Sequence, residues 1–141
     1  MKRFFLLILL AAALPVRAEL RVFACEPEWA ALAQALGGDK VTVYSATHAL
    51  QDPHRIEARP SLIARARTAQ LVVCTGAELE AGWLPAVLRE SGNAGVQPGR
   101  PGYFEAAALV ARLEIPLKLD RAEGDVHASG NPHIHLDPHN L

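Results

Sequence analysis

The stretch Gln70-Leu-Val-Val-Cys74 decides the fold of this chain. Its four consecutive apolar residues are typical of a strand that is buried on both faces of a parallel sheet. Apolar residues at helical spacing predict one helix before this strand, over residues 61–69, and another after it, over residues 78–90. A glycine and a proline inside the second helix predict a break near Trp83.

The same alternation of strand and helix extends towards the N-terminus. Residues 20–25 and 41–45 form short apolar or β-branched runs, and the alanine- and leucine-rich residues 28–36 between them end at Gly37-Gly38. Strands separated by helices predict an α/β fold, with a parallel β-sheet and flanking helices. In such sheets ligands bind beyond the carboxyl ends of the strands, so the loops at that edge are the first candidates for function.

The C-terminal part is less regular. Residues 91–103 are rich in glycine and proline and predict an irregular loop, whereas residues 104–113 predict a short helix. A polar loop follows over residues 121–131, and residues 133–136 predict a last strand. Asp137-Pro138 has the form of a helix start three residues before the sequence ends, so we expect this sequence to be a piece of a longer chain.

Residues 1–18 predict a secretory signal peptide, with basic residues first, an apolar stretch next and a small-residue cleavage pattern that ends at Ala18. We therefore expect a periplasmic domain at residues 19–141, with no direct insertion of the mature chain into the membrane. Without the three basic residues of the signal peptide, 11 basic residues face 15 acidic ones, which gives a formal charge of −4. The absence of a basic stripe argues against a nucleic-acid partner.

Two cysteines in an exported chain raise the question of a disulfide. Cys25 and Cys74 each end an apolar run, so they lie at matching depths if the two runs are neighbouring parallel strands. The alternative is that both are free, small, buried hydrophobic residues. The sequence leaves both possibilities open, because the Cα separation decides between them.

Four of the six histidines fall in the last fifteen residues, at positions 127, 133, 135 and 139. Imidazole is a preferred ligand of borderline metals, so this cluster is first of all a candidate metal site. On a strand, His133 and His135 project from one face and could share a metal. The alternative is that they are solvated histidines near a chain end. His127 is the next candidate, since glycines flank its segment on both sides.

His54 lies far upstream, in Asp52-Pro53-His54, at the predicted carboxyl edge of the sheet. Pro53 and Pro60 stiffen the loop that carries it, which suits a pre-organised ligand but is equally typical of a rigid turn. Asp52 could orient the imidazole by a hydrogen bond or could cap the turn. We expect His48, near the start of this loop, to be an ordinary surface residue.

Enzymatic functions find less support in the sequence. It contains no Gly-x-Ser-x-Gly, no His-Glu-x-x-His and no glycine-rich phosphate loop. His54, His133 and His135 could supply the three protein ligands of a hydrolytic zinc site, but no acid or base has a compelling position beside them. We therefore expect the chain not to be an enzyme.

With these motifs in view, the chain resembles the periplasmic solute-binding proteins of zinc and manganese ABC importers. The resemblance covers most of the mature sequence and rests on four motifs in order. They are Gly38-Asp-Lys-Val-Thr-Val43, Asp52-Pro-His54 with Arg59-Pro-Ser61, Ala69-Gln-Leu-Val-Val-Cys-Thr-Gly-Ala-Glu-Leu-Glu80 with Trp83-Leu84, and Asn131-Pro-His-Ile-His-Leu-Asp-Pro138.

The resemblance implies one lobe of a two-lobed protein whose metal lies in the cleft between the lobes. It implies His54 and His133 as ligands, makes His135 a secondary candidate, and makes the segment around His127 a short version of a metal-gathering loop. It also implies that the remaining ligands belong to a second lobe that is absent here. Residues 19–141 are then the N-terminal metal-binding lobe.

The expected function is capture of a divalent metal outside the inner membrane and its delivery to a cognate ABC permease. Zinc is favoured over manganese because imidazoles dominate the visible ligands. Two alternatives stay open: a metal-dependent hydrolase, and a non-functional fragment that keeps the fold of the lobe.

Overall fold

The computed structural model describes residues 18–120, 122, 124 and 126–140. The predicted signal peptide therefore lies outside the described residues, apart from Ala18. The core is a four-stranded parallel sheet with the strand order β2-β1-β3-β4. Its strands are β1 (Leu20–Ala24), β2 (Val41–Ser45), β3 (Leu71–Cys74) and β4 (Tyr103–Glu105). The decisive apolar run is the inner strand β3, as predicted.

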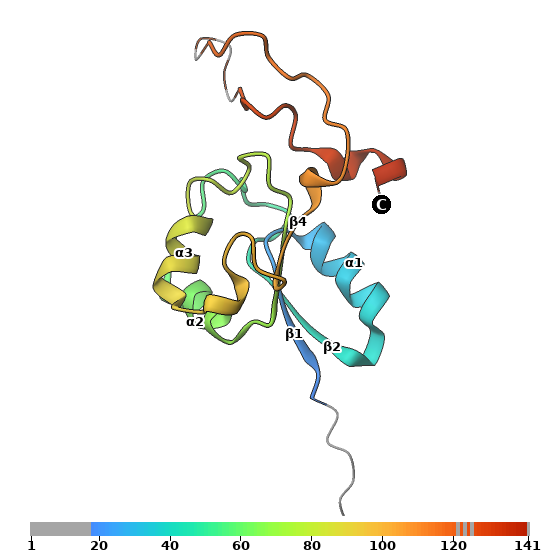
Figure 1. The fold of residues 1–141 in the computed structure, drawn as a ribbon, viewed down its shortest axis with the longest axis vertical. Coiled ribbons are helices and arrows are strands. Elements are labelled where there is room, and N and C mark those ends of the chain that lie inside the picture. Colours follow the sequence, from blue (N-terminus) through green and yellow to red (C-terminus); the bar gives the residue numbers. More distant parts are fainter. Residues whose placement is uncertain (1–17, 121, 123, 125, 141) are drawn as a thin grey trace, which may run out of the picture.

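Helices cover both faces of the sheet (Figure 1). Helix α1 (Pro27–Gly37) lies on one face, and α2 (Pro60–Thr68) and α3 (Leu84–Ser91) lie together on the other. Successive residues of a strand point to opposite faces, so Phe23 packs in the cluster beneath α2 and α3 whereas Val22 packs beneath α1. The predicted α/β fold with flanking helices is confirmed.

The predicted helix over residues 104–113 is wrong. Residues Tyr103–Glu105 form β4, which pairs with β3, and a single 3-10 turn follows at Ala106–Ala108. The strand can reach β3 because Gly102 has no side chain: a Cβ there would lie 2.6 Å from the carbonyl oxygen of Gly95. The otherwise unpaired edge of β3 thus gains a partner, which local apolar spacing does not reveal.

The predicted last strand over residues 133–136 is also wrong. Ile134–Leu136 forms a 3-10 turn, which begins where the Asn131 side chain accepts a hydrogen bond of 2.9 Å from the backbone N–H of His133. Such Asx turns compete with extended structure. Ile134 is 6% exposed and packs in the cluster beneath α1, so it anchors the turn. The predicted helix start at Asp137-Pro138 is one further short turn, Pro138–Asn140.

The helix predicted over residues 78–90 is wrong in its first part: residues 77–83 form turns, and α3 begins at Leu84, next to the predicted break at Trp83. The open question about the cysteines is settled by the structure: Cys25 and Cys74 form a disulfide, with Cα atoms 4.8 Å apart. Within the described ranges, no helix is long and apolar enough to cross a membrane.

Candidate metal centre

His54 lies on the loop that follows β2, at the carboxyl edge of the sheet. Two contacts with the turns before α3 fix the backbone of this loop. The indole N–H of Trp83 donates to the carbonyl oxygen of Pro53 at 2.9 Å, and Gly82 packs so closely that a Cβ would lie 2.9 Å from the carbonyl oxygen of His54. The imidazole is thus carried on a segment that is held by the buried Trp83 and by the close approach of Gly82.

Asp52 sets the orientation of the His54 ring. Its Oδ1 accepts hydrogen bonds from the His54 ring Nδ1 at 2.8 Å and from the His54 backbone N–H at 3.0 Å. These two bonds hold the pKa of Asp52 below its usual value, so the carboxylate is ionised and can only accept. The proton of His54 therefore sits on Nδ1, which leaves the Nε2 lone pair available for a metal.

His127 faces this lone pair. The two Nε2 atoms lie 2.9 Å apart, and the rings are stacked with centroids 5.0 Å apart. Two imidazole nitrogens on a tetrahedral zinc lie about 3.3 Å apart, given Zn–N distances of about 2.0–2.1 Å. A shift of a few tenths of an ångström would let both nitrogens bind the same ion.

The segment around His127 is tied to the loop after β3. The backbone N–H of Ala128 donates to Glu78 Oε2 at 2.9 Å, and the N–H of Gly130 donates to the carbonyl oxygen of His127 at 3.1 Å. Gly130 has a φ of +92°, and a Cβ there would lie 2.8 Å from the carbonyl oxygen of Leu113. Only glycine fits this close approach, so the segment returns sharply towards Asn131.

His133 completes a group of three imidazoles. Its ring centroid lies 6.3 Å from that of His54, with the rings edge to face, so the two predicted ligands share one rim of the molecule. The three histidines line a cavity of about 450 Å³ together with Glu114 and Asn131. Partial burial lowers the pKa of His133, and its neighbours His135 and His54 lower it further. The neutral form, which is the one that binds metal, is thereby favoured.

His135 lies on the far side of His133. The centroids of these two rings are 6.1 Å apart, and His135 contacts Glu28 and lies edge to face with Trp29. The set His54, His133 and His135 considered for a hydrolase is therefore not the set that faces the cavity, because His127 takes the place next to His54. His48 is exposed, as expected, and His139 is exposed and bonded to Asp137.

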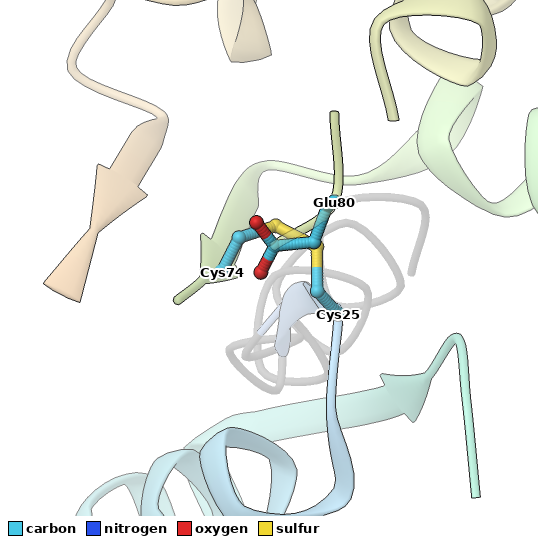
Figure 2. A group of neighbouring side chains, drawn as sticks. All are labelled: Cys25, Cys74 and Glu80. Carbon is cyan, nitrogen blue, oxygen red and sulfur yellow. A yellow bond between two sulfur atoms is a disulfide. The ribbon is translucent and has the colours of Figure 1, made fainter. Parts of the chain in front are cut away.

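A second group of potential ligands lies deep beneath the same edge (Figure 2). One ligand atom each from Cys25, Cys74 and Glu80 lies within 4.8 Å of the others, which holds for no other group of three or more such side chains among the described residues. The two sulfurs are bonded to each other, however, so neither is a thiolate. Within the described part of the chain, the histidines form close pairs, not a closed three-ligand shell.

The carboxylates of this buried group have structural partners. Glu80 accepts hydrogen bonds from the backbone N–H groups of Thr75 and Gly76 at 2.8 and 3.0 Å. Burial raises its pKa, although these bonds oppose the shift. Burial and the charge of Glu80 raise the pKa of Glu26 to about 9, so Glu26 is protonated at neutral pH. Thr75 links Glu26 to the indole N–H of Trp29.

Sequence reasoning identified the four histidines but missed the acidic residues that position them. Glu78 belongs to a motif that carries the family resemblance, yet its spacing gives no sign that it binds the segment around His127. Glu28 lies in the first turn of α1, where acidic residues are common for electrostatic reasons alone. Both contacts join segments that are far apart in the sequence, so no local signal could have found them.

Fold and histidines together define a class: a parallel α/β domain with a histidine-lined cavity at the carboxyl edge of its sheet. The profile of one family, the zinc-uptake complex component A, periplasmic, matches residues 22–141. The chain belongs to this family. A comparison with curated proteins finds no match.

Solved structures share the fold. The chain is 23% identical to a crystal structure of ZnuA (TM-score 0.64) and covers 87% of its own length and 42% of that chain. It is 22% identical to a zinc-bound ZnuA deletion mutant (TM-score 0.65), and this match covers 87% of the chain and 42% of the mutant. It is 19% identical to a Mn-bound periplasmic metal binding protein from Candidatus Liberibacter asiaticus (TM-score 0.64), and this match covers 86% of the chain and 40% of that protein. The chain thus spans about two fifths of the length of these structures.

Proposed function

We propose that this chain captures a divalent transition metal in the periplasm for delivery to an ABC importer, and that it is not an enzyme. One observation carries the proposal: the Nε2 atoms of His54 and His127 face each other at 2.9 Å beside the ring of His133. Membership of a periplasmic zinc-uptake family supports the same function.

We further propose His54, His133 and His127 as the ligands at this position, with His135 outside the first set. Three imidazoles favour zinc over manganese, since manganese prefers carboxylate ligands. Structures with similar folds carry zinc, manganese or cadmium in their names, which supports a divalent metal without choosing among these. In this proposal residues 1–18 are removed as a signal peptide, and residues 19–141 act as the N-terminal lobe of a two-lobed protein.

The test is calorimetric titration of the purified chain with Zn²⁺ at pH 7.5, repeated with His54→Ala, His127→Ala and His133→Ala. We expect each variant to weaken binding by about tenfold or more, because each removes one ligand of a small set. His48→Ala, which removes an exposed histidine of the same loop, is the matched control and keeps the original affinity. Unchanged affinity in both His54→Ala and His133→Ala would refute the proposed site.

The affinity also depends on pH. Only neutral imidazole binds metal, so zinc affinity falls as pH is lowered through the ordinary imidazole pKa of about 6.5. The lowered pKa of His133 keeps this ligand neutral to a more acidic pH than usual. A zinc affinity that does not change between pH 7.5 and pH 5.5 would exclude imidazole ligands.

A further inference from the structure

The contact between Glu28 and His135 lies on the side of His133 that faces away from His54. Glu28 belongs to the first turn of α1, and His135 belongs to the 3-10 turn near the C-terminus. Their closest atoms, Glu28 Oε1 and His135 Nδ1, are 3.3 Å apart. The side chains are 31% and 22% exposed, so the contact lies near the surface.

The ring nitrogen in this contact, His135 Nδ1, lacks a hydrogen-bond partner among the described residues. His135 Nδ1 is buried, and no described residue forms a hydrogen bond with it, since the approach of Glu28 lacks hydrogen-bond geometry. A buried polar atom without a partner is costly, so it calls for an explanation. The rings of Trp29 and His135 lie edge to face with centroids 6.4 Å apart, and this contact supports the orientation of the imidazole.

The spacing of the two atoms matches that of two ligands on one metal ion. A tetrahedral zinc with one nitrogen and one carboxylate oxygen separates them by about 3.4 Å, given Zn–N and Zn–O distances of about 2.0–2.2 Å. The observed 3.3 Å agrees with this value. A neutral imidazole and an ionised carboxylate also form a donor set that zinc accepts.

We propose that Glu28 and His135 form a second binding position for a divalent transition metal, separate from the one at His54 and His127. Water completes its coordination, and His133 is the nearest further imidazole, 6.1 Å from His135 between ring centroids. With two protein ligands, this position binds more weakly than the one with three. The inference depends on the proposed function only in assigning the same metal to both positions.

The row of side chains then serves both positions. It runs from His127 through His54 and His133 to His135 and Glu28. Neighbouring rings in this row have centroids 5.0, 6.3 and 6.1 Å apart, and His135 contacts Glu28 at 3.3 Å. His133 stands between the two ends. An ion held at Glu28 and His135 is therefore one imidazole away from the tighter position, which gives the weaker position a role in supplying it.

Equilibrium dialysis of the purified chain against Zn²⁺ at pH 7.5 tests the proposal by stoichiometry. We expect two ions per chain, one tight and one at least tenfold weaker. Glu28→Gln, which keeps the size of the side chain and removes its charge, and His135→Ala should each leave only the tight ion. His54→Ala should weaken the tight ion and keep the other. His139→Ala is the control, because His139 is exposed and contacts neither position.

The outcomes separate this inference from the proposed function. One ion per chain, weakened by His54→Ala and unaffected by Glu28→Gln, would overturn the second position and leave the proposed function intact. One ion per chain that Glu28→Gln removes and His54→Ala does not affect would overturn the proposed site at His54 and leave the second position intact. Two ions in Glu28→Gln would also overturn the inference. Circular dichroism checks each fold, and if His135→Ala does not fold, His135→Gln replaces it with the same expected stoichiometry.

Discussion

Two regions at the carboxyl edge of the sheet carry metal-ligand side chains, and they differ in what those side chains can do. The buried region holds Cys25, Cys74 and Glu80 closest together, yet its sulfurs are bonded to each other and its carboxylate is occupied by backbone N–H groups. The exposed region holds imidazoles whose nitrogens face a cavity. Closeness of ligand atoms alone therefore does not identify a site. Their covalent state and their existing partners decide.

The comparison predicts that the buried region determines stability. Replacing both Cys25 and Cys74 by alanine opens a covalent loop between residues 49 positions apart. We expect the free energy of unfolding to fall by ~4 kcal/mol, because the unfolded chain regains that loop entropy. Urea unfolding measures it, and reduction of the wild-type disulfide should lower stability similarly. Zinc affinity of the folded double variant should be unchanged. A large loss of affinity would mean that the two regions are not separate.

In the exposed region, we expect zinc affinity to depend on the hydrogen bonds that orient the imidazoles. Asp52→Asn keeps the shape of the side chain but no longer fixes the His54 proton on Nδ1. We expect zinc affinity to fall by about 10–100-fold, as is typical when a group that orients a ligating histidine is changed. The free energy of unfolding should change little, since Asp52 is exposed. Calorimetry and urea unfolding of the same variant separate the two effects, and an unchanged affinity would contradict the role of Asp52.

A third test uses the proton on Glu26. In the folded chain its pKa is raised to about 9, whereas the glutamate of an unfolded chain has its ordinary pKa of 4.5. The stabilising contribution is therefore complete below pH 4.5 and is lost as pH rises towards 9, by at most about 1.4 kcal/mol per pH unit. Glu26→Gln, which stays neutral, should flatten this dependence in urea unfolding between pH 5 and 8.5. The exposed Glu57→Gln is the control, and equal slopes in both variants would contradict the prediction.

The smallest effect is expected at the link between the two regions. Glu78 belongs to the loop after β3 and accepts the N–H of Ala128 next to His127. Glu78→Ala removes this acceptor and should weaken zinc binding by a few-fold, in keeping with about 1 kcal/mol for one hydrogen bond. The effect should vanish in a His127→Ala background, because Glu78 acts through His127. Equal losses in both backgrounds would show that Glu78 acts independently.

The sheet and its helices could be predicted because burial on both faces and helical spacing are local patterns. Strands β1, β2 and β3 follow from such runs. Strand β4 could not be predicted in this way: residues 103–105 are a strand because β3 offers an edge and Gly102 permits the approach. The alternation at His133-Ile-His135 suggested a strand, but the Asn131 side chain and Pro132 before it favour a turn.

In the candidate site, too, the residues in local motifs could be predicted and those placed by long-range contacts could not. His54 and His133 lie in motifs that can be recognised, and the structure places them on one rim. That His127, and not His135, faces His54 depends on how a distant loop returns across the sheet edge. Glu78 and Gly130 determine that return, and their contacts exist only in the folded chain.

The burial of Ile134 has a consequence for the two histidines on either side of it. It lies between His133 and His135 and is buried among Val22, Ala24 and Trp29, whereas the rings on either side reach the surface. The depth at which this one aliphatic side chain lies in the core therefore helps to set where both imidazoles are held. A smaller residue such as valine would fill the cluster less completely, so we expect Ile134→Val to change the positions of the rings of His133 and His135, although neither ring is itself substituted.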